Sequence, residues 1–292
     1  MSKYLDFIVD KALLLFSLVS LATSILVVGL LGVESFEFFK EISFTDFLFG
    51  TEWEPLIEPQ SFGVLPLVSG TLYIVFGAIL LALPAGLMIA VFLTEFASQK
   101  TRAILKPILE ILAGIPTVVY GYFALSFVTP LIQELFPQTN VFNATSGAIV
   151  VGIMILPMVS SICDDALSSL PNSVREAGYA LGGTSNEVVL QVLIPSASTH
   201  IWSAVILAIS RAIGETMAVT LAAGSTPSLL GSPLDSIQTM TSYIVQVSLG
   251  DVEQGGVAYQ TSFAVAGLLF LMTLVMNVIG HKLARRIQKR NS

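Results

Sequence analysis

The stretch ALLLFSLVSLATSILVVGLL, residues Ala12–Leu31, decides the fold of this chain. It contains 20 residues and no charge. A helix of that length, rising 1.5 Å per residue, crosses a hydrocarbon core about 30 Å thick. The stretch lacks the alternation of polar and apolar residues that marks the strands of a membrane barrel. Because only helices and closed barrels satisfy their backbone hydrogen bonds in lipid, it predicts a transmembrane helix.

Five more apolar windows of similar length follow, so the chain is predicted to be an all-α, polytopic helix bundle with six transmembrane helices. They run approximately over residues 65–93, 104–131, 146–162, 200–223 and 261–280. Lys3 and Lys11 precede the first window, as they would precede a signal peptide, but its apolar run exceeds the usual 7–15 residues. We therefore expect the first window to be retained as a span.

The composition excludes several classes of protein. Of 292 residues, 54% are hydrophobic and 11% are charged, whereas an ordinary soluble domain has about 25% charged residues. The net charge of −7 argues against a nucleic-acid partner. A single cysteine, Cys163, excludes an intrachain disulfide and a cysteine-based metal site. No Gly-Lys pair occurs, so we expect no ATP-binding loop and no cofactor in this chain. The two histidines, His200 and His281, fall at predicted cytoplasmic ends, and no nucleophile–base arrangement is visible inside the spans, so we also expect no metal site and no catalytic residue.

The distribution of basic residues predicts that both termini are cytoplasmic. Of the 13 basic residues, all but Lys40 and Arg211 fall in segments that this topology places inside, as the positive-inside rule requires. The outer segments are strongly acidic. The sequence thus predicts a multi-pass protein of the cell (inner) membrane, with a basic cytoplasmic tail at residues 282–292.

Residues 1–60 comprise the first span and an acidic, phenylalanine-rich outer segment. We expect its aromatic residues to pack against the bundle rather than to form a docking surface, as is usual for large aromatic side chains. In the last outer loop, Ile237, Met240, Ile244 and Val247 share one helical face, which predicts a short external helix. Residues 61–281 form the remaining core with five spans.

The cytoplasmic segment SSLPNSVREAGYALGGTSNEVVLQVLIPSAS, residues 168–198, predicts two short helices joined at Gly182-Gly183. Ser173 stands three residues before Glu176, and Thr184 three before Glu187, as in two capping boxes. Pro195 is expected to end the second helix. This protruding element is suited to a groove on another protein, and a plain connecting loop is the alternative.

Within this segment, Glu176-Ala177, Gly182 and the closing Val192–Pro195 resemble the EAA loop of ABC-importer permeases, although Gly178 stands where a second alanine is usual. The resemblance implies a type I ABC-importer permease fold with a coupling helix at about residues 170–195. It also implies that an ATPase subunit docks there. The docking residues it implies are Arg175, Glu176, Ala177, Gly182 and Pro195.

Four further motifs resemble the permeases of the phosphate-specific Pst importer, of the PstC type. They are SFGVLPLVSGTLY (61–73), LAGIPTVVYGY (112–122), IMILPMVSSICDDAL (153–167) and SRAIGETMAV (210–219). The resemblance implies import of inorganic phosphate with a second, PstA-type permease subunit and an extracytoplasmic phosphate-binding protein. It also implies two copies of an ATPase subunit that bind ATP and Mg²⁺.

Arg211 is predicted about 15 Å into the fifth span, near the middle of the bilayer. An arginine there costs at least about 2.5 kcal/mol, so it needs an aqueous cavity or a partner. Glu215, four residues on, is expected to pair with it on the same helical face. The guanidinium fork matches two phosphate oxygens. We therefore predict a substrate path at Arg211 and Glu215, and a clasp between helices is the alternative.

In the third span, Pro116 is expected to bend the helix, and Thr117 and Tyr120 to donate hydrogen bonds toward an oxyanion. Glu110 is read as the partner of Lys106 at the inner interface. Asn277 and Cys163 are expected to serve packing or interhelical hydrogen bonding.

The sequence thus favours the permease subunit of a phosphate importer that works by alternating access. The alternatives are a permease for another tetrahedral oxyanion and, in a different class, a cation channel or ion-coupled transporter without an ATPase. The acidic outer mouth favours the second alternative, whereas the arginine within a span and the two capping boxes argue against it.

Overall fold

The structure is a computed structural model that describes residues 2–229, 231–250, 252–253 and 255–291. The side chains of residues 2–6, 281 and 283–291 lie outside the description, and with them most of the predicted basic tail. Six segments are long and apolar enough to cross a membrane, as predicted: Phe7–Glu41, Leu65–Phe96, Thr117–Leu135, Ala144–Ser168, Ser185–Ile213 and Val257–Gly280.

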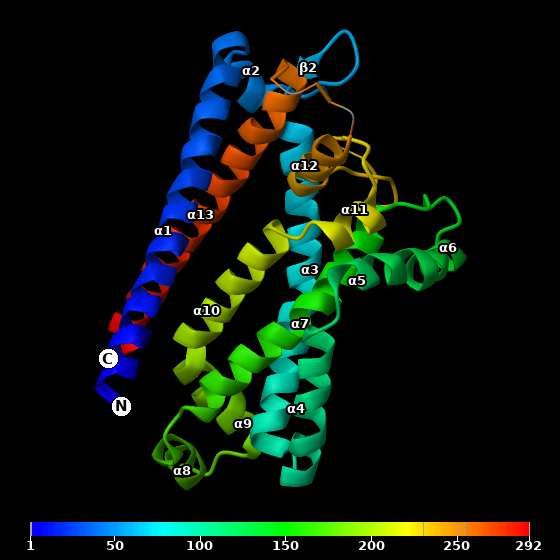
Figure 1. The fold of residues 1–292 in the computed structure, drawn as a ribbon. Coiled ribbons are helices and arrows are strands. Elements are labelled where there is room, and N and C mark those ends of the chain that lie inside the picture. Colours follow the sequence, from blue (N-terminus) through cyan, green and yellow to red (C-terminus); the bar gives the residue numbers. More distant parts are fainter. Residues whose placement is uncertain (1, 230, 251, 254, 292) are drawn as a thin grey trace.

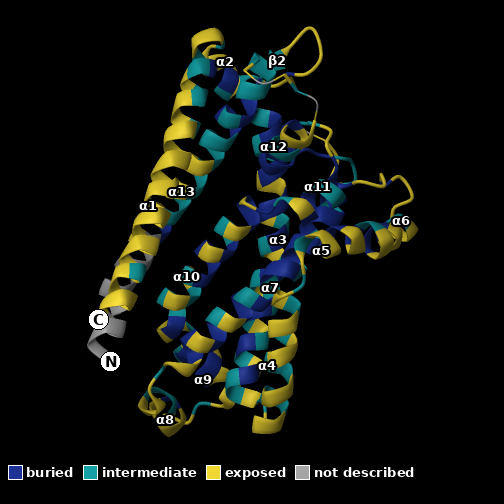
Figure 2. Cartoon of the chain, in the orientation of Figure 1, coloured by how far each residue is buried: buried dark blue, intermediate teal, exposed yellow. Residues whose placement is uncertain are grey.

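The first and last helices lie side by side at one edge of the bundle (Figure 1). Helix α1 (Ser2–Glu41) packs along α13 (Val257–Asn291). The apolar window of α1 buries no residue inside the chain, and Figure 2 shows it exposed along most of its length. Both chain ends lie nearer to α8 (Asn172–Ala180) than to α2 (Phe44–Phe49), so we refer to the α8 end and the α2 end of the bundle.

The centre of the bundle is built on the contact between α3 (Leu65–Val91) and α7 (Ala144–Ser168). Small residues let the two backbones approach closely, as is common between membrane helices. A Cβ at Gly86 would lie 2.8 Å from Val159, and one at Gly77 would lie 2.7 Å from Ala148. Helix α10 (Ile194–Ile213) packs on both helices and on α13.

The predicted third window, 104–131, joined two different helices. Helix α4 (Gln99–Ala113) begins at Ser98, whose hydroxyl accepts the Thr101 N–H, and it ends before Gly114. The chain is extended at Pro116, because the ring disfavours helix at the preceding residue. The span itself comprises α5 (Thr117–Phe123), the π-helical η2 (Ala124–Val128) and α6 (Thr129–Leu135). Pro116 therefore interrupts the helix instead of bending it.

The predicted fifth window, 200–223, is also divided. The span begins earlier, with α9 (Ser185–Val188) and the π-helical η3 (Val189–Leu193), and continues through α10. It ends at Gly214, about half way along the bundle (Figure 1). The short α11 (Met217–Ala223) follows as a separate helix.

A second core lies at the α2 end. There α2, the antiparallel pair β1 (Trp53–Glu54) and β2 (Ser61–Phe62), and α12 (Met240–Leu249) pack on α13. Phe38, Phe47 and Trp53 are buried in edge-to-face ring contacts, which confirms the packing prediction for these residues. Other phenylalanines of the segment stay exposed: Phe36, Phe44 and Phe49. The short helix predicted from Ile237, Met240, Ile244 and Val247 is confirmed as α12 for the last three residues, whereas Ile237 lies in the loop before it; Met240 and Val247 are buried.

Candidate functional site

The predicted coupling helix is α8, followed by a turn and α9, at one extreme of the bundle (Figure 1). Gly182 has φ +84°, the left-handed conformation expected of a glycine elbow. The second capping box is confirmed: Thr184 Oγ1 accepts the Glu187 N–H at 3.4 Å, and the Glu187 carboxylate accepts the Thr184 N–H at 2.8 Å.

The first capping box, Ser173 with Glu176, is wrong. Helix α8 begins at Asn172, directly after Pro171, and has no side-chain cap. Ser173 therefore lies inside the first turn, where its hydroxyl cannot cap the N–H three residues on. Proline is well suited to a helix start because its fixed φ fits and its missing N–H would have no partner there.

Gly178 fits closely against the next helix. A Cβ at this position would lie 3.1 Å from both methyl groups of Val188. The glycine that replaces the alanine usual in the motif thus lets α8 and α9 approach each other. The opposite face of the element is exposed, including Glu176, Ala177, Tyr179 and Leu181.

Arg175 points toward the membrane-spanning helices. Its guanidinium contacts the Glu95 carboxylate at 3.0 Å and donates to the carbonyls of Leu167 at 2.8 Å and Leu170 at 2.9 Å. These bonds join α8 to the end of α7 and to η1 (Phe92–Phe96), the π-helical extension of α3. Arg175, predicted to dock a partner, therefore holds the coupling helix to its own bundle.

Pro195 does not end the second helix. It is the second residue of α10, and the helical backbone runs from Ser185 to Ile213. The π-helical turn η3 just before it, in which the Ile194 N–H bonds to the Val189 carbonyl, accommodates the proline.

Arg211 and Glu215 do not form the predicted pair. Helix α10 ends at Ile213, so the two residues do not share a helical face. In the described part of the chain no ion pair involves Arg211, whose side chain is exposed in the last turn of α10. Glu215 is buried, and its carboxylate accepts the Ala218 N–H at 3.2 Å at the start of α11.

Tyr120 and Thr117 lie at the start of α5. The Tyr120 hydroxyl is buried and donates to the Leu112 carbonyl at 2.8 Å, so in this structure it bridges the interruption between α4 and α5. Thr117, the first residue of α5, is half-buried. The structure thus places both residues at the turn between the helices, and their contact with a substrate stays a prediction.

The sequence reasoning missed an ionic cluster around Asp164 in α7, whose side chain is 1% exposed. It accepts hydrogen bonds from Arg102 at 2.9 Å, Thr94 at 2.8 Å and Lys106 at 3.4 Å. Lys106 thus bonds to α7, and its predicted pairing with Glu110 is not among the ion pairs of the described residues. The available signal was the pair Asp164-Asp165, which directly follows the predicted apolar window 146–162.

Two predicted packing residues behave as expected. Cys163 is fully buried in the central core. Asn277 accepts a hydrogen bond from Ser210 at 3.0 Å, which links α13 to α10.

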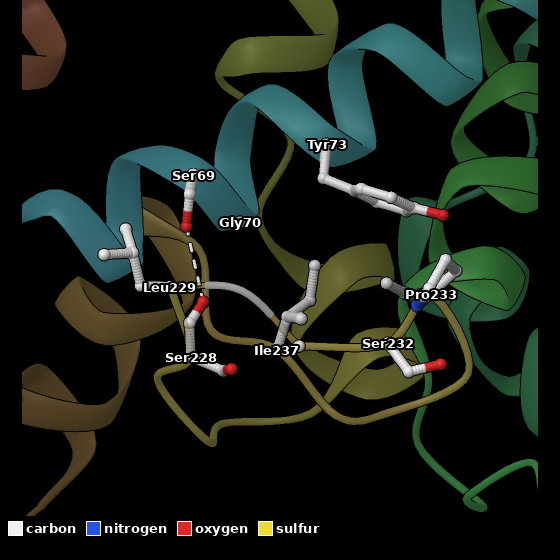
Figure 3. A pocket seen from close by; sticks show the side chains of 10 residues that line it. Ser69, Gly70, Tyr73, Ser228, Leu229, Ser232, Pro233 and Ile237 are labelled. Carbon is white, nitrogen blue, oxygen red and sulfur yellow. Dashed lines mark hydrogen bonds between the residues drawn. The ribbon is translucent and has the colours of Figure 1, made fainter.

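A cavity of about 260 Å³ lies at the α2 end, between α3 and the loop that follows α11 (Figure 3). Hydroxyl groups line part of it, and Ser69 Oγ donates to the Ser228 carbonyl at 3.3 Å. Its lining carries no charged side chain: Ser69, Gly70, Tyr73, Ala144, Ser228, Leu229, Gly231, Ser232, Pro233 and Ile237.

The amino-acid sequence of most of this bundle matches a known family of transport proteins. Residues 82–289 match the binding-protein-dependent transport system inner membrane component. The chain belongs to this family. It is therefore the permease subunit of a binding-protein-dependent ABC importer, a multi-pass inner-membrane protein and a transporter component rather than an enzyme.

Relatives of this permease agree over nearly the whole chain. The probable ABC transporter permease protein YqgH of Bacillus subtilis is 34% identical over 272 residues, covering 92% of this chain and 88% of the relative. The phosphate transport system permease protein PstC of Mesorhizobium japonicum is 32% identical over 298 residues, covering 92% and 89%. PstC of Pasteurella multocida is 32% identical over 301 residues, covering 96% and 90%.

Solved structures confirm the type I importer fold. A chain of a bacterial ABC transporter that imports the acidic polysaccharide alginate superposes with a TM-score of 0.67 at 16% identity, covering 98% of this permease and 99% of that chain. A chain of the inward-facing MetNI methionine ABC transporter gives a TM-score of 0.57 at 17% identity, covering 77% and 94%.

Proposed function

We propose that this permease imports inorganic phosphate as one of two transmembrane subunits of an ATP-driven importer. The observation that carries the proposal is the similarity to permeases named for phosphate transport. These are 32% identical over more than nine-tenths of the chain. The four motifs that resemble the PstC type are spread along the spans, from Ser61 to Val219, so the similarity is not confined to the EAA loop.

The proposed energy source is ATP hydrolysis by a partner subunit that docks on the coupling helix. The exposed face of α8, with Glu176 and Ala177, is the proposed docking surface for the ATPase, and Gly182 shapes the turn behind it. ATP and Mg²⁺ are bound by two copies of that partner. With the ATPase at the α8 end, this end and both termini are cytoplasmic, in accord with the distribution of basic residues.

The proposed substrate path passes Arg211. Its side chain is exposed in the isolated chain and lies where α10 stops, near the middle of the bundle. Facing lipid, it would cost at least about 2.5–3.5 kcal/mol. Facing the space between this permease and a second, PstA-type subunit, it meets water and an oxyanion instead. A guanidinium there attracts phosphate, and its unpaired state leaves both N–H edges available.

Delivery of phosphate at the α2 end is assigned to an extracytoplasmic phosphate-binding protein. The segment there carries Glu34, Glu37, Glu41 and Asp46, and an acidic surface repels free phosphate. A docked protein that releases its ligand directly into the path avoids this repulsion. Alternating access then follows when ATP-driven closure of the ATPases moves α8.

The test is reconstitution in liposomes with the second permease, the ATPase and the binding protein. We expect ATP hydrolysis and uptake to be stimulated by phosphate-loaded binding protein and not by sulfate- or molybdate-loaded protein. Stimulation by another tetrahedral oxyanion alone would overturn the substrate assignment. Ion flux through the permease without ATPase would favour the channel or ion-coupled transporter instead.

A further inference from the structure

Three elements of the bundle meet at one buried carboxylate near the α8 end. Asp164 of α7 accepts from Thr94 of η1 and from Arg102 and Lys106 of α4. Its side chain is 1% exposed, whereas Arg102 and Lys106 are about one-third exposed. Because separating α4 from α7 would leave the Asp164 carboxylate buried without its cationic partners, the cluster favours the arrangement in which these elements stay in contact.

The residue next to Thr94 makes the corresponding contact with the coupling helix. Glu95 accepts from Arg175 of α8 at 3.0 Å, and its side chain is 10% exposed. Arg175 is also fixed by two carbonyls at the end of α7. The turn η1 therefore contacts α7 through Thr94 and α8 through Glu95, and α4 joins the same Asp164 carboxylate.

The backbone of η1 is π-helical, with the Ala97 N–H bonded to the Phe92 carbonyl at 2.8 Å. Such wide turns are rare and occur frequently at functional sites. A cavity of about 310 Å³ between α4 and α7 lies beside the cluster and is lined by Lys106, Ser160 and Asp164. Ser160 Oγ is buried there without a hydrogen-bond partner. The cavity leaves room for α4 to move against α7.

The far end of α4 is the interruption at Gly114–Pro116, which Tyr120 bridges by its bond to Leu112. A displacement of α4 therefore acts directly on the start of α5, where the predicted path residue Thr117 lies. Polar contacts, joined by the backbone of η1 and by the helix α4, thus link α8 to the interruption in the third span.

We propose that Glu95 and Asp164 are positioning residues for energy coupling. Movement of α8 passes through Arg175 and Glu95 to η1, and from Thr94 to Asp164 and α4. We call this series the coupling relay. It rests on the proposed function, because it requires an ATPase that pushes on α8.

The test compares Glu95→Gln and Asp164→Asn in the reconstituted complex, with Asp165→Asn as the matched control. Asp165 is the neighbouring aspartate, 72% exposed and 3.9 Å from Lys106. We expect both relay variants to assemble with the ATPase and to hydrolyse ATP. The phosphate imported per ATP should fall at least tenfold, whereas Asp165→Asn keeps the wild-type ratio.

The double variant distinguishes two contacts that act in series from two contacts that stabilise the bundle independently. In a series, Glu95→Gln with Asp164→Asn gives the ratio of the worse single variant. Multiplication of the two single losses would overturn the relay, and so would a wild-type ratio in both single variants. Should Asp164→Asn fail to assemble, Thr94→Val removes only one bond to the same carboxylate and is measured in its place.

A second measurement follows the movement of α4 and does not depend on which anion is transported. The only cysteine of the chain, Cys163, is fully buried, so Ala113→Cys at the exposed end of α4 can be labelled selectively with a maleimide. We expect nucleotide binding by the ATPase to change the labelling rate at least threefold, and Glu95→Gln to abolish that change. An equal nucleotide effect with and without Glu95→Gln, or none in the parent, overturns the relay. Uptake of another anion with the labelling change intact overturns only the phosphate assignment.

Discussion

Arg211→Ala tests the proposed path directly. The guanidinium is exposed and has no ion pair among the described residues. Its removal therefore breaks no described ionic contact within the chain, and alanine is the better helix former. We expect the complex with the second permease and the ATPase to assemble normally.

The expected loss is in transport. A hydrogen bond to a charged group contributes about 1.5–3 kcal/mol, and each 1.36 kcal/mol is a factor of ten. If the guanidinium contacts phosphate during passage, uptake in Arg211→Ala falls by about 10- to 150-fold. Arg211→Lys keeps the charge but loses the two-pronged fork, so we expect an intermediate loss.

The assay is uptake of radiolabelled phosphate into proteoliposomes at a fixed ATP concentration, with Lys282→Ala as the control for loss of an exposed charge. Wild-type uptake in Arg211→Ala would refute the path assignment. An arginine that faces lipid costs about 2.5–3.5 kcal/mol. If the Arg211→Ala variant were also more stable to heat by a comparable amount, the Arg211 side chain would be facing lipid.

Four further substitutions test local features. Gly182→Val forces a branched side chain into φ +84° at a cost of about 1–2 kcal/mol, and should weaken capture of the ATPase in a pull-down; full capture would contradict the role of the turn. Thr184→Ala removes the capping box at a cost of about 1 kcal/mol and should speed amide exchange in α9 about fivefold, which an unchanged rate would disprove. Gly86→Val places a Cβ 2.8 Å from Val159 and should lower the free energy of unfolding by about 1–3 kcal/mol. The control is Gly29→Val, whose Cβ would have nothing within 4 Å. Equal melting temperatures of the two variants would contradict the close packing at Gly86. Burial raises the pKa of Tyr243 to about 12. The unfolded chain therefore loses the tyrosine proton first, and the free energy of unfolding falls as the pH rises from about 10 to 12. Tyr243→Phe should abolish this fall, and if the fall persisted, another group would be its cause.

Much of the fold could be predicted from apolar length and from turn residues. The run from Ala12 to Leu31 defines a helix whatever surrounds it, because lipid allows no other structure there. The interruptions were harder to predict. The window around Pro116 stays apolar across the break, and the window around Gly214 is apolar apart from Arg211 and Glu215, so each was read as one continuous helix.

The candidate site was predicted less completely, because its contacts join distant parts of the chain. Glu95 and Arg175 are 80 positions apart, and Lys106 and Asp164 are 58 apart. Helix geometry alone predicts ion pairs only between residues three or four positions apart. They therefore assigned Lys106 and Arg211 to glutamates on their own segments, and Gly214 separates Arg211 from Glu215.

The two hydrophobic cores described above give the permease two packed bodies that share the helices α3 and α13. The aromatic core at the α2 end contains Phe38, Trp53 and Tyr243, and the central core contains α3, α7 and α10; the partly buried Leu269 borders both. A tilt within the larger body leaves the rings of the smaller one in register, because packed interiors shift as units. We therefore expect the surface proposed for the binding protein at the α2 end to change its shape little during the transport cycle, so that the same receptor can engage it before and after each turnover.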